Sequence, residues 1–154
     1  MKYAFFLGCN IPARLPQYES SSRAVLARLG VELIDYREFN CCGYPLRNVD
    51  QKAFLLSAAG NLALAERDGH DILVLCKCGF GTFKEAQHRL KTNEALKEEI
   101  NDLLKKQGLS YQGRVEVKHL LSVLYHDVGL DVLKKNITVK KNIFVRTKGL
   151  KIAT

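Results

Sequence analysis

Two short runs of the chain consist of apolar residues, and each leads directly into cysteine. Tyr3–Leu7 is followed by glycine and Cys9, and Ile72–Leu75 is followed by Cys76. Continuous apolar runs of this length are typical of strands that are buried on both faces, as in a parallel sheet covered by helices on each side. They therefore restrict the chain to folds in which both faces of a sheet are covered.

Helical patterns separate the strand-like runs. A helix is expected from Pro16 to Leu29, ended by Gly30, and a second one from a cap at Asp50 to Asp68. Strand and helix alternation of this kind predicts an α/β domain, a parallel sheet flanked by helices with right-handed crossovers. The other expected elements are strands at Val31–Ile34 and Val115–Val117, a helix that opens near Thr82 and continues through Leu96, Ile100 and Leu104 to Gly108, and a helix from Leu120 to Val128 ended by Gly129.

All the cysteines lie within the first 78 residues of the chain, at Cys9, Cys41, Cys42, Cys76 and Cys78. The predicted topology places them beyond the carboxyl ends of strands, where open α/β sheets bind their ligands. Grouped cysteines in a chain without a secretion signal indicate a metal site rather than a disulfide framework. Thiolates are soft ligands that suit iron–sulfur clusters, zinc or copper(I).

The spacing of the cysteines favours a cluster over a single ion. Side chains two residues apart in an extended segment point the same way, so Cys76 and Cys78 are expected to face one metal. The adjacent Cys41 and Cys42 diverge in an extended segment, and a multi-iron cluster accepts ligands from different directions more readily than one compact ion does. Zinc stays open as an alternative, and a simple thiol redox protein ranks below both because the spacing of Cys76 and Cys78 is not Cys-x-x-Cys.

The charge of the chain is concentrated at its end. The formal net charge is +8, and the segment from Lys134 to Thr154 holds seven basic residues and no acidic one. This segment has no aromatic platform beyond Phe144 and no known DNA-binding motif, so a connector is favoured over a nucleic-acid partner. The opening apolar run, Tyr3–Leu7, is too short for a secretion signal, and no run approaches the roughly 20 residues of a membrane span. We therefore expect a cytoplasmic protein.

These features resemble the cysteine-rich "CCG" domain found in the B subunit of heterodisulfide reductase and its relatives. The resemblance covers nearly the whole chain, and the spaced cysteines make it specific. The matching segments are Lys2–Cys9 with Pro12, Leu29–Leu33, Cys41–Gly43, Asn61–Ala65, Asp71–Cys76, Gly81–Ala86 and Val117–His119.

The resemblance implies one lobe of a two-lobed redox subunit within a multi-subunit complex. In such proteins the motif occurs once per lobe and holds a non-cubane [4Fe–4S] cluster, and two clusters together cleave a disulfide. It implies a CCG-type domain over 1–139 and, over 140–154, a basic connector with the first strand of a missing second lobe, Leu150–Thr154. A single lobe is then expected to be inactive alone. The alternative is a non-catalytic zinc-binding or assembly lobe.

Carried over by residue, the resemblance assigns cluster ligation to Cys9, Cys41, Cys42 and Cys76, with Cys78 as a fifth candidate. The family pattern is Cys-x-x-Cys, which would place the last cysteine at position 79, where this chain has Gly79. Either Cys78 replaces that ligand or the site has lost it. We favour the loss, because Phe80–Thr82 aligns without a gap only when Gly79 fills the cysteine position.

Overall fold

A computed structural model describes residues 1–136, which form an α/β domain around a parallel sheet. Within these residues the sheet has four strands in the order β2-β1-β3-β4, and every neighbouring pair is parallel. The predicted fold class is confirmed. The strands are β1 (Lys2–Phe6), β2 (Glu32–Asp35), β3 (Ile72–Val74) and β4 (Val117–His119).

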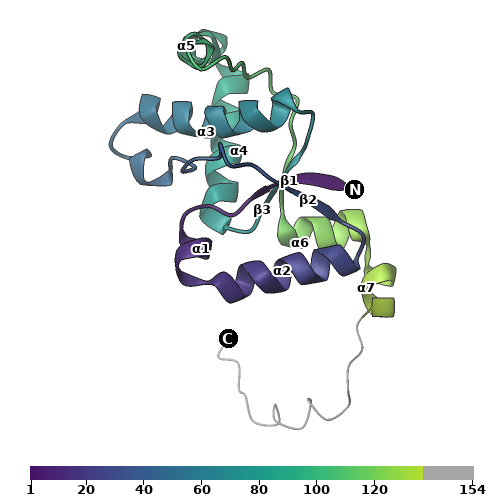
Figure 1. The fold of residues 1–154 in the computed structure, drawn as a ribbon. Helices are drawn as coiled ribbons and strands as arrows, with labels where there is room; N and C mark the ends of the chain where they lie inside the picture. The colour runs from purple at the N-terminus through teal and green to yellow at the C-terminus, as the bar shows by residue number, and fades with distance from the viewer. Residues whose placement is uncertain (137–154) are drawn as a thin grey trace, which may run out of the picture.

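Helices cover the sheet on both sides, so that the strands lie in the middle layer (Figure 1). One side carries α3, α4 and α5, and the other carries α2 and α6. The helices described are α1 (Asn10–Arg14), α2 (Pro16–Arg28), the short 3-10 helix η1 (Tyr44–Leu46), α3 (Gln51–Arg67), α4 (Lys77–Thr92), α5 (Glu94–Lys105), α6 (Leu120–Ser122), the π-helix η2 (Val123–Val128) and α7 (Leu130–Asn136).

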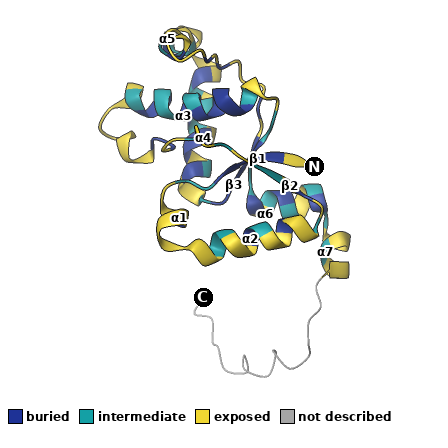
Figure 2. Cartoon of the chain, viewed as in Figure 1, coloured by how far each residue is buried: buried dark blue, intermediate teal, exposed yellow. Residues whose placement is uncertain are grey.

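The central strands are buried on both faces, as their apolar runs predict (Figure 2). Successive side chains of a strand point to opposite faces. Ala4 and Phe6 accordingly belong to the core beneath α3 and α4, whereas Tyr3 and Phe5 belong to the core beneath α2. The side chains of β3 are divided between the same two cores.

The predicted caps of α3 are confirmed. The carboxylate of Asp50 accepts hydrogen bonds from the backbone N–H groups of Lys52 at 3.0 Å and Ala53 at 2.9 Å, which satisfies two donors that the first turn leaves unpaired. The helix ends before Gly69, which has a left-handed φ of 71°.

Three predicted boundaries were wrong. The helix expected to run from near Thr82 to Gly108 is two helices, because Asn93 is extended and its side chain accepts from the Leu96 N–H at 3.0 Å, capping α5. The last strand is β4 at Val117–His119, two residues later than Val115–Val117. Val115 precedes the strand and is buried, so its apolar side chain reflects packing in the core and not hydrogen bonding to a neighbouring strand.

The third wrong boundary is the start of α4. This helix begins at Lys77 and not near Thr82, because Cys76 is extended and takes the N-cap position directly after the strand. The first turn is closed by a hydrogen bond from the Phe80 N–H to the Cys76 carbonyl at 2.9 Å. Cys78 therefore lies in a helix and not in a loop.

Some expectations fall outside the described residues. The end of the basic segment, the division at 139 and the strand at Leu150–Thr154 lie wholly or partly beyond residue 136. Among residues 1–136, no helix combines the length and apolar character needed to cross a membrane.

Candidate functional site

The cysteines follow the carboxyl ends of three parallel strands, β1, β2 and β3, and so lie at one end of the sheet. The chain leaves β1 for β2 on one side and later adds β3 on the other, so the strand order reverses between β1 and β3. Open α/β sheets bind ligands in the crevice at such a switch point. Cys9 follows β1 and Cys76 follows β3, so these two residues flank the switch point.

Gly8 and Cys76 pack closely across this switch point. A β-carbon built on Gly8 would lie 3.6 Å from the β-carbon of Cys76. Gly8 has a left-handed φ of 74°, which turns the chain from β1 toward Cys9 at the start of α1. The thiol of Cys9 is free and exposed at that helix end.

Cys41 and Cys42 differ sharply in exposure, as the predicted divergence of adjacent side chains requires. Cys41 is exposed, whereas Cys42 is only 7% exposed and belongs to the core beneath α3 and α4. The backbone N–H of Gly43 donates to the Cys41 sulfur at 3.5 Å. Gly43 turns the chain with a left-handed φ of 91°, and η1 follows it.

Burial raises the pKa of the Cys42 thiol, and the neighbouring Cys41 and Cys76 raise it further. The Tyr44 backbone N–H and the nearby Thr82 side chain act in the opposite direction on this pKa, because polar groups beside the sulfur favour a thiolate. Cys42 therefore lies within electrostatic reach of thiols from its own loop and from the end of β3.

Side chains from α3 and α4 hold the backbone of the two cysteine segments. From α3, the Asn61 amide donates to the Cys41 carbonyl at 3.1 Å, and the Ser57 hydroxyl donates to the same carbonyl. From α4, the Thr82 hydroxyl donates to the Cys78 carbonyl at 2.8 Å. Asn61 and Thr82 are both almost fully buried. The sequence did not predict that Asn61 and Thr82 hold the cysteine segments. The sequence feature that could have indicated Asn61 is a single asparagine among alanines and leucines.

The expectation that Cys76 and Cys78 face one metal as alternate residues of a strand was wrong. Cys78 lies in the first turn of α4 and is exposed, whereas Cys76 is half-buried at the N-cap. Helical residues two apart do not share a face. Gly79 is buried instead, and a β-carbon built on it would meet Phe6 and Val74 at 3.4 Å.

His119 takes the N-cap position of α6. Its ring accepts from the Leu121 N–H at 3.3 Å, and its other nitrogen lies 3.2 Å from the Leu75 carbonyl. These contacts fix the ring at the start of α6, beside the end of β3.

The donor chemistry at this edge fits a sulfur-ligated metal centre. All five cysteines are free thiols, and they come from three separate segments. Within residues 1–136, no three His, Cys, Asp or Glu side chains are close enough together to hold one metal ion.

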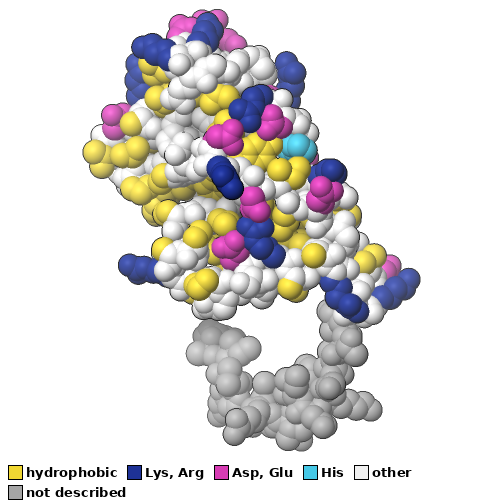
Figure 3. All heavy atoms as spheres, viewed as in Figure 1, with side chains coloured by type: hydrophobic (Ala, Val, Ile, Leu, Met, Phe, Trp, Pro, Cys, Tyr) yellow, Lys and Arg dark blue, Asp and Glu magenta, His cyan; other side chains and the backbone are white. Residues whose placement is uncertain are grey.

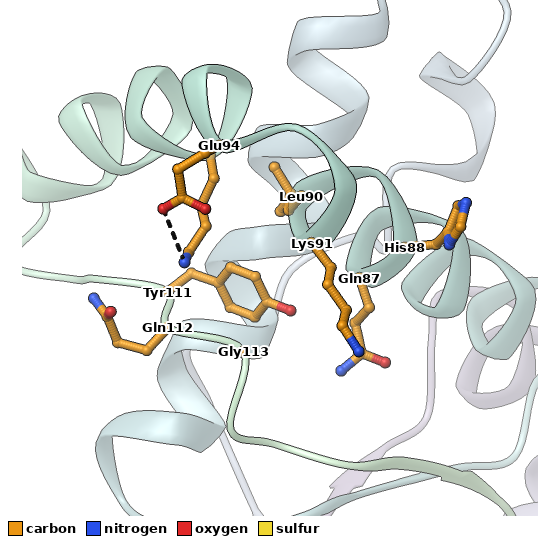
Figure 4. Close-up of a pocket in the computed structure, with 9 residues that line it drawn as sticks. Gln87, His88, Leu90, Lys91, Glu94, Tyr111, Gln112 and Gly113 are labelled. Atoms are coloured by element: carbon orange, nitrogen blue, oxygen red, sulfur yellow. Dashed lines mark hydrogen bonds and ion pairs between the residues drawn. The ribbon is translucent and has the colours of Figure 1, made fainter.

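A separate cavity of about 480 Å³ lies between α4, α5 and the segment around Tyr111 (Figure 4). Glu94 and Lys97 form an ion pair at its wall, at 3.3 Å. No cysteine lines it. Leu90, in its wall, is twelve residues along α4 from Cys78, or about 18 Å at the rise of an α-helix. This cavity is therefore not part of the cysteine site.

The loops around the cysteines carry apolar side chains into solvent. Figure 3 shows apolar side chains gathered along the side of the molecule, at the left of the view, where these loops lie. Large contiguous apolar areas on a protein surface mark interaction sites. The exposed large apolar residues of these loops are Leu15, Tyr44, Leu46 and Val49, of which Val49 is 83% exposed; we call them the apolar rim.

The fold and the grouped thiols define a cysteine-rich α/β domain, and comparison with known proteins agrees. The model of the cysteine-rich domain family named CCG matches residues 3–80. The chain belongs to this family, which confirms the resemblance found in the sequence.

Curated relatives carry names that refer to redox complexes. A protein of Archaeoglobus profundus, named for its likeness to the B subunit of heterodisulfide reductase, is 38% identical over 139 residues. The B subunit of the ferredoxin/F420H2-dependent CoB–CoM heterodisulfide reductase of Methanosarcina acetivorans is 34% identical over 146 residues. An 8-methylmenaquinol:fumarate reductase membrane anchor subunit of Wolinella succinogenes is 34% identical over 128 residues.

The chain spans about half the length of the curated relatives it matches. The alignments cover 89% and 94% of this chain but 46% and 49% of the Archaeoglobus and Methanosarcina proteins. They cover 82% of this chain and 44% of the Wolinella protein. Among solved structures, a hypothetical protein from Helicobacter pylori superimposes with a TM-score of 0.70 at 25% identity, over 77% of this chain and 24% of that one.

Proposed function

We propose that this domain holds an iron–sulfur cluster on its cysteines and serves as a redox subunit that passes electrons to a thiol/disulfide couple. The observation that carries the proposal is the placement of free cysteines from three segments after the carboxyl ends of parallel strands, around the switch point of the sheet. Membership of the CCG family and the names of the relatives support it.

In this proposal Cys9, Cys41, Cys42 and Cys76 supply the thiolate ligands, and the cluster is of the non-cubane [4Fe–4S] type that the resemblance implies. When bound, such a cluster supplies electron transfer at a potential set by its ligands, by hydrogen bonds to sulfur and by burial. The chain itself supplies the Gly43 N–H as a donor to the Cys41 sulfur and a buried setting for Cys42.

Reductive cleavage of a disulfide consumes two electrons and two protons and releases two thiols. The electrons must come from outside this domain, so we assign their delivery to a partner subunit with a reduced redox centre, within a heterodisulfide-reductase-like complex. The apolar rim supports such a partner, or the further half of a longer protein, at the cysteine edge. Free thiols persist in a reducing compartment, which favours the cytoplasm.

The experiment is metal analysis of protein purified without oxygen and reconstituted with iron and sulfide. We expect stoichiometric iron, acid-labile sulfide and a visible chromophore, all reduced in Cys42→Ser and Cys76→Ser. Absence of all three from the parent protein would refute the proposal. Stoichiometric zinc without a chromophore, with unfolding on chelation, would establish the zinc-holding alternative instead.

The fifth ligand position gives a sharper comparison. Gly79 and Thr82 are three residues apart on the buried side of α4, and a β-carbon built on Gly79 would meet Phe6 and Val74 at 3.4 Å. Cys78 is exposed on another side of the helix. The match of Phe80–Thr82 to the family pattern without a gap supports a lost ligand at position 79.

We therefore expect Gly79→Cys to raise the iron content or the oxygen tolerance of the cluster, and Cys78→Ser to leave both nearly unchanged. Cys76→Ser is the matched control for loss of a ligand on the same segment. Equal iron in the parent and in Gly79→Cys, with severe loss in Cys78→Ser, would assign the fifth position to Cys78.

A further inference from the structure

Asn61 is a polar side chain at the centre of an apolar helix face. It is 1% exposed, and the four residues that follow it on α3, Leu62–Ala65, are all buried and apolar. Burying an amide without hydrogen bonds is costly, so a buried asparagine indicates a specific set of partners.

Every hydrogen-bonding atom of the Asn61 amide is used. Its Oδ1 accepts from the Asn40 N–H at 2.8 Å, and its Nδ2 donates to the Cys41 carbonyl at 3.1 Å and to the Ser57 carbonyl at 2.9 Å. Two of these three bonds reach the backbone immediately before Cys42. The Ser57 hydroxyl adds a second donor to the Cys41 carbonyl.

We propose that Asn61 is a positioning residue for the cysteine loop: its amide fixes the backbone of Asn40 and Cys41 and thereby sets where the Cys41 and Cys42 thiols lie. Because Cys41 and Cys42 are adjacent, a rotation of this backbone segment moves both thiols. The inference rests on the proposed function for its redox consequence, but the placement of the loop can be tested without any cluster.

The chain offers a matched control in Asn101. Its amide also clamps a loop by two backbone bonds, donating to the Tyr111 carbonyl at 3.0 Å and accepting from the Tyr111 N–H at 2.7 Å. That loop lies by the cavity of Figure 4, which no cysteine lines. Asn101→Ala therefore removes a similar clamp while leaving the cysteine segments untouched.

The first test uses reduced, metal-free protein. Cys42 is buried, so its alkylation by iodoacetamide requires local opening of the loop, whereas the exposed Cys9 reports direct reaction in the same sample. Mass spectrometry of Asn61→Ala should show Cys42 reacting about tenfold faster relative to Cys9, the change expected from losing one or more hydrogen bonds that close the loop. Asn101→Ala should leave this ratio unchanged.

The second test uses reconstituted protein. The reduction potential and the electron paramagnetic resonance spectrum of the cluster should change in Asn61→Ala and stay as in the parent in Asn101→Ala. Asn61→Asp places a buried carboxylate oxygen against the Cys41 and Ser57 carbonyl oxygens, so it should accelerate Cys42 alkylation at least as much as Asn61→Ala does. Should Asn61→Ala fail to fold, Ser57→Ala removes one bond to the same Cys41 carbonyl and should accelerate Cys42 alkylation to a smaller extent.

Equal alkylation ratios in Asn61→Ala and Asn101→Ala, after correction for global unfolding, would overturn the inference and leave Asn61 a residue of general stability. A parent protein that takes up no iron would refute the proposed function while the alkylation comparison still decides the role of Asn61. An altered ratio together with an unaltered potential and spectrum would overturn the redox part of the inference.

Discussion

Gly43 permits a close approach between the cysteine loop and α3, and its replacement tests that contact. A β-carbon at Gly43 would lie 2.8 Å from the Phe54 carbonyl oxygen and 3.3 Å from the Ser57 β-carbon. The carbonyl belongs to the backbone of α3 and cannot rotate away as a flexible side chain would. The alanine must also adopt the left-handed φ of 91°.

The two effects can be estimated separately. A non-glycine residue in the left-handed region costs about 1–2 kcal/mol, and forcing an extra carbon into a packed contact costs about 1–3 kcal/mol more. Gly43→Ala should therefore lower the free energy of unfolding by about 2–5 kcal/mol in total. The strain falls on the residue next to Cys42, so the buried thiol should also become accessible to alkylation.

Gly30→Ala is the control, because Gly30 has a left-handed φ of 74° but nothing within 4 Å of a built β-carbon. It should show only the conformational cost, about 1–2 kcal/mol. Urea unfolding, followed by circular dichroism and treated as two-state, measures both variants. If the two variants lose the same stability, the close approach of Gly43 to α3 is not a real contact and the reasoning fails.

Two further substitutions have expected signs of their own. Gly79→Ala should raise the free energy of unfolding by about 0.5–1 kcal/mol, because alanine is the better helix former and its β-carbon makes ordinary contacts at 3.4 Å. A lower free energy of unfolding in urea would show that there is no room for the added β-carbon. Asp127→Asn should cost about 1–2 kcal/mol at neutral pH, since its carboxylate accepts from the Tyr3 hydroxyl at 2.8 Å and the Lys118 ammonium at 3.1 Å. Burial opposes ionisation of Asp127, but these two partners outweigh it and lower its pKa, so the stabilisation by its carboxylate is present above the ordinary pKa near 3.8 and is lost as the pH falls. In Asp127→Asn the urea midpoint should therefore decrease less steeply toward acid pH than in the parent. An unchanged acid dependence would contradict this.

The strand and helix framework followed from local patterns. The apolar runs at β1 and β3 predicted strands buried on both faces, and Asp50 predicted the start of α3, because these signals come from residues adjacent in the chain. The same patterns did not reveal the break at Asn93. Leu90 and Ile100, on either side of it, pack into one core, so apolar spacing continues across the boundary.

The sequence also determined at which end of the sheet the cysteines lie, because residues that follow the strands of a parallel sheet share its carboxyl end. Only the tertiary structure decided how they are presented. It placed Cys78 in the first turn of α4, exposed it, and buried Gly79 against Phe6 and Val74. It also brought Asn61, some twenty residues further along the chain, onto the backbone of Cys41. The exposure and the hydrogen bonds of a residue depend on partners that are distant in sequence. The spacing of residues along the chain does not identify those partners.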